Sequence, residues 1–193
     1  MLKNSLSTYG SVAKWLHWLI AAWVLAAYVI ILYLDWRSDA FPLPGLNYHK
    51  AVGFSILIPV VLRIVWRFVS PPPRLPDGMP GWQRRVSGLS HFLLYFLLLA
   101  MPLSGYFGNG GGVNYGFFRV PPFSRTALSA WLNDSAGFTF AQQDSFFDTF
   151  HYGIVGPYIF WVLILIHAGA AIWHHVVQKD DILKRMLPGK PRS

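Results

Sequence analysis

The chain has 193 residues, of which 54% are hydrophobic and only 12% are charged, and its mean hydropathy is +0.39. This composition is too apolar for an ordinary soluble domain, and the length allows one compact domain over residues 1–193. The chain contains no cysteine. This excludes disulfides, thiolate metal sites, iron–sulfur clusters and the C-x-x-C-H attachment of haem.

Four apolar segments are each long enough to cross about 30 Å of hydrocarbon. In chain order they are Trp15 to Leu34, Ala51 to Val69, Val86 to Phe107 and Gly153 to Val177. The second contains Pro59, Arg63 and Arg67, which a membrane helix tolerates when the arginines extend to the interface. The sequence therefore predicts an all-α integral membrane protein, a bundle of four transmembrane helices.

Basic residues are distributed unevenly around these spans. With the N-terminus inside, the inner flanks hold twelve of the sixteen basic residues, and the outer segments hold only Arg37, Lys50, Arg119 and Arg125. This asymmetry predicts that both termini are cytoplasmic and that the net charge of +8 serves topology and contact with anionic membrane lipid. Nucleic-acid binding is not expected, because no basic patch is interleaved with solvent-facing aromatic residues.

Two connections between the spans have distinct compositions. The inner one, Ser70 to Arg85, contains three consecutive prolines and cannot be helical throughout. The outer one, from Gly108 to about Phe150, is long and starts with a glycine-rich run, but it carries many aromatic residues. We therefore expect this long periplasmic loop to pack and to contain a short amphipathic helix before His151.

Histidines occur at two depths of the predicted bundle. His49 and His151 lie at the outer starts of the second and fourth spans, whereas His17 and His167 lie toward the inner face. Sixteen residues separate His151 from His167, which is about 24 Å along a straight helix. Two imidazoles on facing helices, with room for a planar macrocycle between them, are what bis-histidine haem ligation requires.

This pattern predicts an outer pair, His49 with His151, and an inner pair, His17 with His167. Gly53 and Gly169 lie near these histidines and would let a porphyrin approach the backbone. His91, His174 and His175 remain interchangeable candidates for the inner site. For each histidine the alternative is a hydrogen bond between helices, and zinc is a weaker alternative because the chain has no glutamate and its histidines are scattered.

Several motifs, in order, resemble one family. They are AKWLHWLIAAWVLAAY around His17, YHKAVGFSILIPVVLRIVWR around His49, LSHFLLYFLLLAMPLSGY around His91 and LIHAGAAIWHH followed by KDDILKRMLPG. Together with SPPP they are similar to the bacterial cytochrome b561 family over nearly the whole chain. No single motif is diagnostic, but their ordered combination is specific.

The resemblance implies a four-helix inner-membrane protein with two b-type haems that passes electrons between an outer donor and ubiquinone. It also implies that His17, His49, His151 and His167 are the axial ligands of the haem irons. Some members of the family are similar to superoxide oxidases, which take an electron from superoxide at the periplasmic side.

The chain departs from the family in one spacing. Members usually separate the two fourth-span ligands by fourteen residues, whereas here the separation is sixteen. Fourteen steps bring two side chains to within about 40° of one face of a regular helix, but sixteen leave them about 160° apart. We therefore expect a break near Gly156 and Pro157, where a kink or wide turn would absorb the extra residues and leave His151 in the preceding turn or helix.

Further residues are candidates for the two ends of the electron path. Lys50 and Arg119, with the other outer basic residues, would make the donor entrance positive and steer superoxide, or they are loop charges balanced by nearby aspartates. At the inner side His91, His174 and Arg74 would surround a quinone head group, or they serve only as positive-inside residues. Arg63 and Arg67 would pair with haem propionates or anchor the second span.

Two classes of function stay open at this point. The first is an oxidoreductase that converts superoxide or another small donor with quinone as acceptor. The second is an electron-carrying membrane subunit for a separate periplasmic redox protein, without small-molecule chemistry of its own. A third class, a scaffold without haem, would give a colourless protein.

Overall fold

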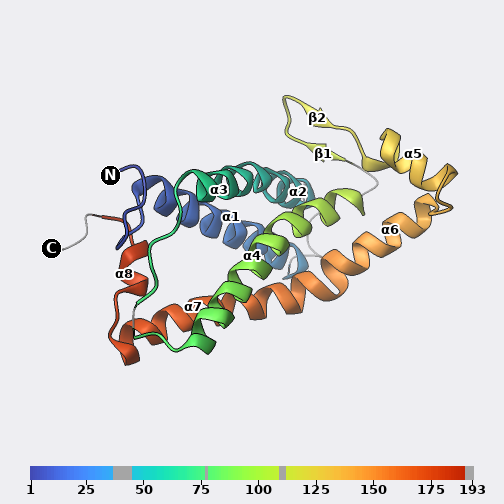
Figure 1. The fold of residues 1–193 in the computed structure, drawn as a ribbon. Coiled ribbons are helices and arrows are strands. Elements are labelled where there is room, and N and C mark those ends of the chain that lie inside the picture. Colours follow the sequence, from blue (N-terminus) through green and yellow to red (C-terminus); the bar gives the residue numbers. More distant parts are fainter. Residues whose placement is uncertain (37–44, 77, 109–111, 190–193) are drawn as a thin grey trace. The chain divides into compact units, whose positions relative to one another are not determined.

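A computed structural model of the chain describes residues 1–36, 45–76, 78–108 and 112–189 (Figure 1). Most of these residues are helical. The greater part of the connection between the first two spans, Arg37 included, lies outside the described residues, as do positions 109–111 of the glycine-rich run.

Helices carry all four predicted spans. The first is α1 (Ser11–Trp36), the second is α2 (Gly45–Ser55) with α3 (Leu57–Val69), the third is α4 (Gly81–Phe107), and the fourth runs through α6 (Phe140–Asp148), η2 (Thr149–Phe160), α7 (Trp161–Trp173) and η3 (His174–Gln178). The stretches apolar enough to cross a membrane are Ser11–Tyr33, Leu46–Val69, Gly81–Phe107 and Phe140–Gln178. The prediction of an all-α, four-helix membrane protein is confirmed.

Every span begins earlier than its apolar segment. The third helix starts at Gly81 and not at Val86, because Trp82 to Arg85 continue the helix although they are largely polar. The second starts at Gly45 and not at Ala51, so His49 lies inside a helix and not before one. Hydropathy locates the hydrocarbon-crossing part of a helix, while polar interfacial residues extend the helix beyond it.

The second span is interrupted at one residue. Ile56 separates α2 from α3, and its amide donates to the Gly53 carbonyl at 3.2 Å, three residues back. Pro59 explains the interruption, because it has no amide hydrogen to bond the Ser55 carbonyl four residues earlier. Nearby, the Ser55 hydroxyl donates to the Ala51 carbonyl at 2.7 Å.

The internal contacts of the chain divide it into two compact units. Unit 1 comprises residues 1–20, 58–97 and 160–193, and unit 2 comprises residues 21–57 and 98–159. Each unit draws residues from all four spans. The expectation of a single domain over residues 1–193 stays a prediction.

In unit 1 the N-terminal segment is bonded to the proline-rich connection. Asn4 receives the Gly10 amide on its side-chain oxygen at 2.8 Å and donates its side-chain amide to the carbonyls of Ser70 and Pro71. The connection is not helical from Ser70 to Pro76, as predicted from its prolines. Through these bonds, polar main-chain groups at the end of the second span find hydrogen-bond partners within the protein.

In unit 2 the long outer connection has structure of its own. It contains a hairpin of β1 (Val113–Asn114) and β2 (Arg119–Val120), a short 3₁₀ turn η1 (Phe123–Arg125), and then α5 (Ala127–Asp134) before α6. Helix α6 confirms the predicted helix before His151. Thr139 forms a capping box with Gln142 at its start.

A buried polar pair joins α5 to α6. The Ser129 hydroxyl donates to Gln143 Oε1 at 2.6 Å, and Gln143 Nε2 donates to the carbonyls of Ser129 and Phe138. Both side chains are at most 2% exposed. In the same unit the rings of Phe107, Phe123 and Phe147 pack with centroids 4.5 to 6.3 Å apart, so two aromatic residues of the connection pack against the end of α4.

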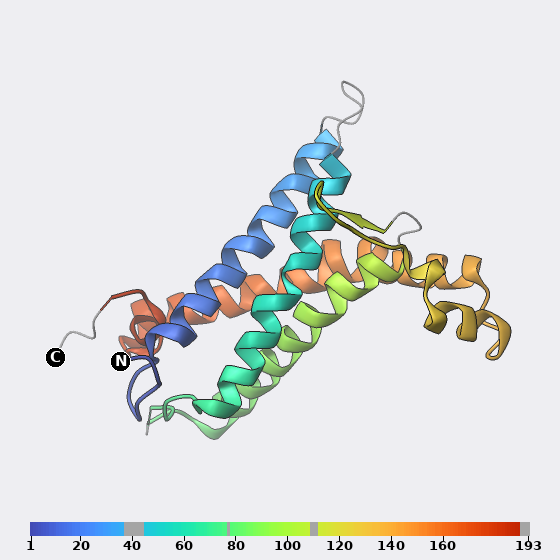
Figure 2. The ribbon, with the colours of Figure 1, turned by 90° about the horizontal axis from the view of Figure 1, so that it is seen from above.

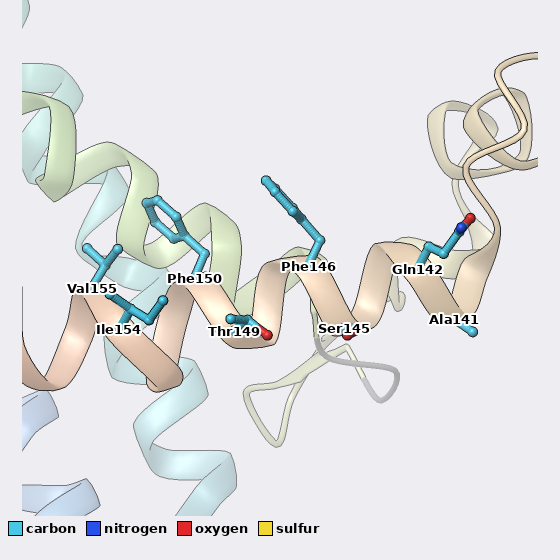
Figure 3. A pocket seen from close by; sticks show the side chains of 8 residues that line it. All are labelled: Ala141, Gln142, Ser145, Phe146, Thr149, Phe150, Ile154 and Val155. Carbon is cyan, nitrogen blue, oxygen red and sulfur yellow. The ribbon is translucent and has the colours of Figure 1, made fainter.

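A hollow of about 560 Å³ runs along α6 and η2 and is lined by Gln142, Phe146, Phe150 and Val155 among others (Figure 3). None of the site residues predicted from the sequence lines it.

We predict that Gln143→Ala lowers the free energy of unfolding by about 1 to 3 kcal/mol, because it leaves the buried Ser129 hydroxyl without its acceptor. The change should appear as a lower midpoint of thermal unfolding in detergent. Ser145→Ala, an exposed position on the same helix, should change the stability by less than about 0.5 kcal/mol. Equal midpoints for the two variants would contradict the structural role of the pair.

Candidate functional site

The predicted outer histidines face each other within unit 2. His49 lies in the second turn of α2 and His151 lies near the start of η2, and their ring centroids are 6.1 Å apart with an interplanar angle of 79°. The two side chains come from different spans, as the sorting by depth predicted. Both rings are only partly exposed.

Each of the two rings forms a hydrogen bond from Nδ1 to a main-chain carbonyl. His49 Nδ1 lies 2.9 Å from the Ala27 carbonyl, and His151 Nδ1 lies 2.8 Å from the Met101 carbonyl and 3.1 Å from the Ser104 hydroxyl. A carbonyl oxygen can only accept, so each Nδ1 donates its proton. In a neutral imidazole this leaves Nε2 with a free lone pair, which is the form that binds a metal.

Gly105 of α4 lies directly against the His151 ring. A Cβ added at Gly105 would be 2.7 Å from His151 Cε1 and 3.0 Å from Nδ1, closer than such atoms can approach. Glycine at this position therefore lets α4 supply both the Met101 carbonyl and the Ser104 hydroxyl at hydrogen-bond distance. Sequence reasoning missed this contact, because nothing in the apolar run around Gly105 marks it.

Three histidines meet within unit 1. The rings of His17 (α1) and His167 (α7) have centroids 6.1 Å apart at 71°, and the ring of His91 (α4) is 5.4 Å from that of His167 at 84°. His91 Nδ1 lies 2.7 Å from the Ser87 carbonyl of its own helix, so this nitrogen is also a donor. The structure thus brings together the predicted inner pair and one of the alternative candidates.

The pair distances suit an iron atom between two imidazoles. A metal–nitrogen bond is about 2 Å and the nitrogen is about 1 Å from the ring centre, so two rings on one metal have centroids about 6 Å apart. His17–His167 and His49–His151 both match this value. The His91–His167 distance of 5.4 Å is shorter, which favours His17 as the partner of His167.

The number of ligands favours a macrocycle over a bare ion. Although His17, His91 and His167 meet, no three His, Cys, Asp or Glu side chains in the described ranges are placed so that they could hold one metal ion, whereas protein zinc sites use three or four. A porphyrin supplies four nitrogens itself and needs only two axial ligands. A Cβ added at Gly53 or Gly169 would meet no protein atom within 4 Å, so neither backbone is covered by another side chain.

The fourth span is wound wide around and after His151. Residues Thr149–Phe160, with Gly153, Gly156 and Pro157 among them, form a π-helix. Of the two distortions expected near Gly156 and Pro157, a kink or a wide turn, the structure has the wide turn. The expected break is wrong, because the helix continues through both residues. Each residue of a π-helix advances by less than the 100° of an α-helix, so the opposed orientation calculated for a regular helix does not follow.

Tyr28 supports this wide segment from α1. Its hydroxyl donates to the Gly156 carbonyl at 2.7 Å, next to the proline that cannot donate within the helix. A Cβ at Gly156 would also clash with the His151 carbonyl and lie 3.0 Å from Met101 Cε. The wide turns, the absence of a side chain at Gly156 and the hydrogen bond from Tyr28 together fix the position of the helix segment that carries His151.

Arginines of α3 lie near the inner histidines. Arg63 donates to the Ala13 carbonyl at 2.7 Å and lies within electrostatic reach of His17 and His167. Arg67 instead lies over the Tyr95 ring, 5.8 Å from its centroid. Arg63 therefore interacts with both histidines of the inner pair, whereas Arg67 lies within electrostatic reach of His91 beside them.

The three candidate quinone residues have different contacts. His91 meets His167, whereas His174 Nδ1 pairs with Asp180 and the Arg74 main chain bonds to Leu6 and to the Arg185 side chain. The Asp180 partner was not foreseen from the sequence, because Asp180 follows the apolar run.

Two residues were predicted to form the outer donor entrance. Lys50 follows His49 on α2 and interacts electrostatically with Asp148, so part of its charge is compensated. Arg119 lies on β2, which belongs to the hairpin beside α2. Both lie in unit 2, together with the outer histidine pair.

Comparisons with known proteins find similarity over nearly the whole chain. Residues 8–189 match the family model described as prokaryotic cytochrome b561. Cytochrome b561 homolog 2 of Escherichia coli is 33% identical over 98% of this chain and 96% of its own length, and cytochrome b561 homolog 1 is 26% identical over 95% and 98%. A probable superoxide oxidase, CybB of Yersinia pestis, is 26% identical over 94% and 97%.

We predict that Gly105→Ala perturbs the outer pair, because the new methyl group would displace the His151 ring from the Met101 carbonyl. Bound haem should fall to about half, measured as pyridine haemochrome per chain. Alanine favours a helix by about 1 kcal/mol over glycine, so the loss cannot come from helix propensity.

The matched control is Gly88→Ala on the same helix, where a Cβ meets nothing within 4 Å. It should retain the full haem content. Full haem content and an unchanged spectrum in Gly105→Ala would show that His151 does not depend on this contact.

Proposed function

This chain belongs to the prokaryotic cytochrome b561 family, and from that premise we propose that it is a dihaem cytochrome of the bacterial inner membrane. As a family member it is a membrane electron-transfer protein with haem b. In the proposal both termini are cytoplasmic, and electrons pass from a periplasmic donor to ubiquinone.

One observation carries the proposal: each unit contains one histidine pair with centroids 6.1 Å apart. We assign His49 and His151 to one haem iron, and His17 and His167 to the other. Haem, when bound, supplies a reversible one-electron iron couple. The carbonyls of Ala27 and Met101 orient the outer rings, and burial among apolar residues keeps water away from them.

Charged and polar residues have supporting roles in this proposal. Arg63, close to both inner histidines, would neutralise a haem propionate, while Arg67 is held by Tyr95. Gly53 and Gly169 would contact the two macrocycles. His91, next to His167, and His174 with Arg74 farther along unit 1 would bind ubiquinone on the inner side.

Superoxide is the proposed donor. The support is the relationship to a probable superoxide oxidase, together with Lys50 and Arg119 in the unit that contains the outer pair. Two superoxide ions would each lose one electron and leave as oxygen, and ubiquinone would take up those two electrons with two protons. A positive entrance would raise the encounter rate with the anionic donor.

One prediction of this proposal concerns haem content. The purified protein should bind two b-type haems, and His17→Ala, His49→Ala, His151→Ala and His167→Ala should each lose one. The test is a pyridine haemochrome count with the reduced-minus-oxidised spectrum. His175→Ala should retain both haems, and a His151→Ala variant with two haems would overturn the assignment of the outer pair.

Another prediction of this proposal concerns the electron donor. In stopped-flow experiments superoxide alone should reduce the haems at a rate near the diffusion limit, and the rate should fall as salt increases. Lys50→Gln should slow the reaction several-fold at low salt and little at high salt.

Lys184→Gln, which changes the same charge on the inner side of the predicted topology, should leave that rate unchanged. If superoxide does not reduce the haems while a periplasmic redox protein does, the chain is instead the electron-carrying subunit of such a partner.

A further inference from the structure

The tip of the outer hairpin is aromatic and exposed. Strands β1 and β2 pair Asn114 with Arg119, and the Tyr115 amide donates to the Phe118 carbonyl at 3.0 Å, which leaves Gly116 and Phe117 at the turn. Gly116 has φ of +86°, as the first central residue of a type II′ turn requires. The Phe117 side chain is 87% exposed and that of Phe118 is 49% exposed.

The hairpin is docked on α2 by one tyrosine. The Tyr115 hydroxyl lies 3.0 Å from the Ser55 hydroxyl and 3.3 Å from the Ala51 carbonyl. Its ring stacks on Phe118 with centroids 4.6 Å apart and planes 13° apart. Figures 1 and 2 both show the hairpin beside α2.

The docking point lies in the outer part of the second span. The helical stretch that is apolar enough to cross a membrane runs from Leu46 to Val69, and its continuous apolar segment starts at Ala51, so Ser55 lies about 6 Å inside that segment along the helix axis. Ala51 and Ser55 lie on one face of α2, and Ala51 is about 160° from the direction of His49. The hairpin therefore covers the face of α2 turned away from the histidine pair.

We propose that this tip is a membrane anchor, with the rings of Phe117 and Phe118 embedded in the outer leaflet of the bilayer. The lipid surface is the partner that its position indicates, because the hairpin is held on the outer part of a membrane span, with Ser55 inside the apolar segment. Residues 113 to 118 carry no charge, and basic Arg119 follows, the order expected from the acyl region to the head groups.

The polar groups of the tip fit this environment. The Tyr115 amide is bonded to Phe118, the Gly116 amide donates to Asn114 Oδ1 at 2.9 Å, and the Tyr115 hydroxyl is held by α2. Backbone groups that enter the lipid interface need such internal partners. The inference does not depend on the haem ligands or on the electron donor proposed above.

The absence of native cysteine allows a direct test. A nitroxide label on Phe117→Cys, in the full-length protein reconstituted in phosphatidylcholine vesicles, should be several-fold more accessible to oxygen than to a water-soluble nickel chelate. The label on Leu128→Cys, 54% exposed on α5 of the same connection, should show the opposite preference.

Two results would overturn the proposal: a preference for the nickel chelate at position 117, or shielding from both reagents, which would indicate a protein partner or a second copy of the chain. Tyr115→Phe added to Phe117→Cys tests the docking. It should increase the mobility of the label and leave the haem spectrum unchanged, whereas unchanged mobility would contradict the role of the hydroxyl.

Discussion

The bond between a histidine ring nitrogen and a main-chain carbonyl is the interaction on which the outer site depends. An imidazole among membrane helices is costly unless both its nitrogens are satisfied. Ala27 and Met101 each satisfy one nitrogen of a ring. The bond also fixes the tautomer, so Nε2 of each ring is the nitrogen that keeps a free lone pair.

Those carbonyls are available only because the surrounding helices approach closely. Gly105 has no side chain, which lets α4 lie against His151. The same helix then presents Ser104 as a second hydrogen-bond partner. In unit 1 the arrangement differs, because two other histidine rings lie against His167 and an arginine from α3 lies within electrostatic reach of it. The two histidine pairs therefore have the same spacing but different electrostatic surroundings.

The sequence predicted the four spans because twenty apolar residues have few alternatives to a membrane helix. It also predicted which histidines would meet, since depth in a span follows from counting residues, and the structure brings these pairs together. Their coordination of haem iron stays a prediction.

What the sequence did not reveal lies in backbone geometry. The carbonyls bonded to the rings and the close approach at Gly105 depend on how helices pack, which hydropathy and spacing do not record. A proline near a glycine indicated an irregularity in the fourth span, but the same residues are compatible with a kink, a break or a wide turn. Asp180, the partner of His174, was missed for a similar reason: their contact depends on the turn at Lys179, which has φ of +56°.

The hydrogen bond from Tyr28 to Gly156 has a consequence for solvent. A helix that widens within a bilayer frees carbonyl oxygens, and such oxygens ordinarily attract water into the lipid-covered part of a protein. Here a phenol hydroxyl from another span donates to one carbonyl of the widened segment, that of Gly156. That carbonyl therefore needs no water molecule as its partner, and the same bond ties the widened segment to a neighbouring span.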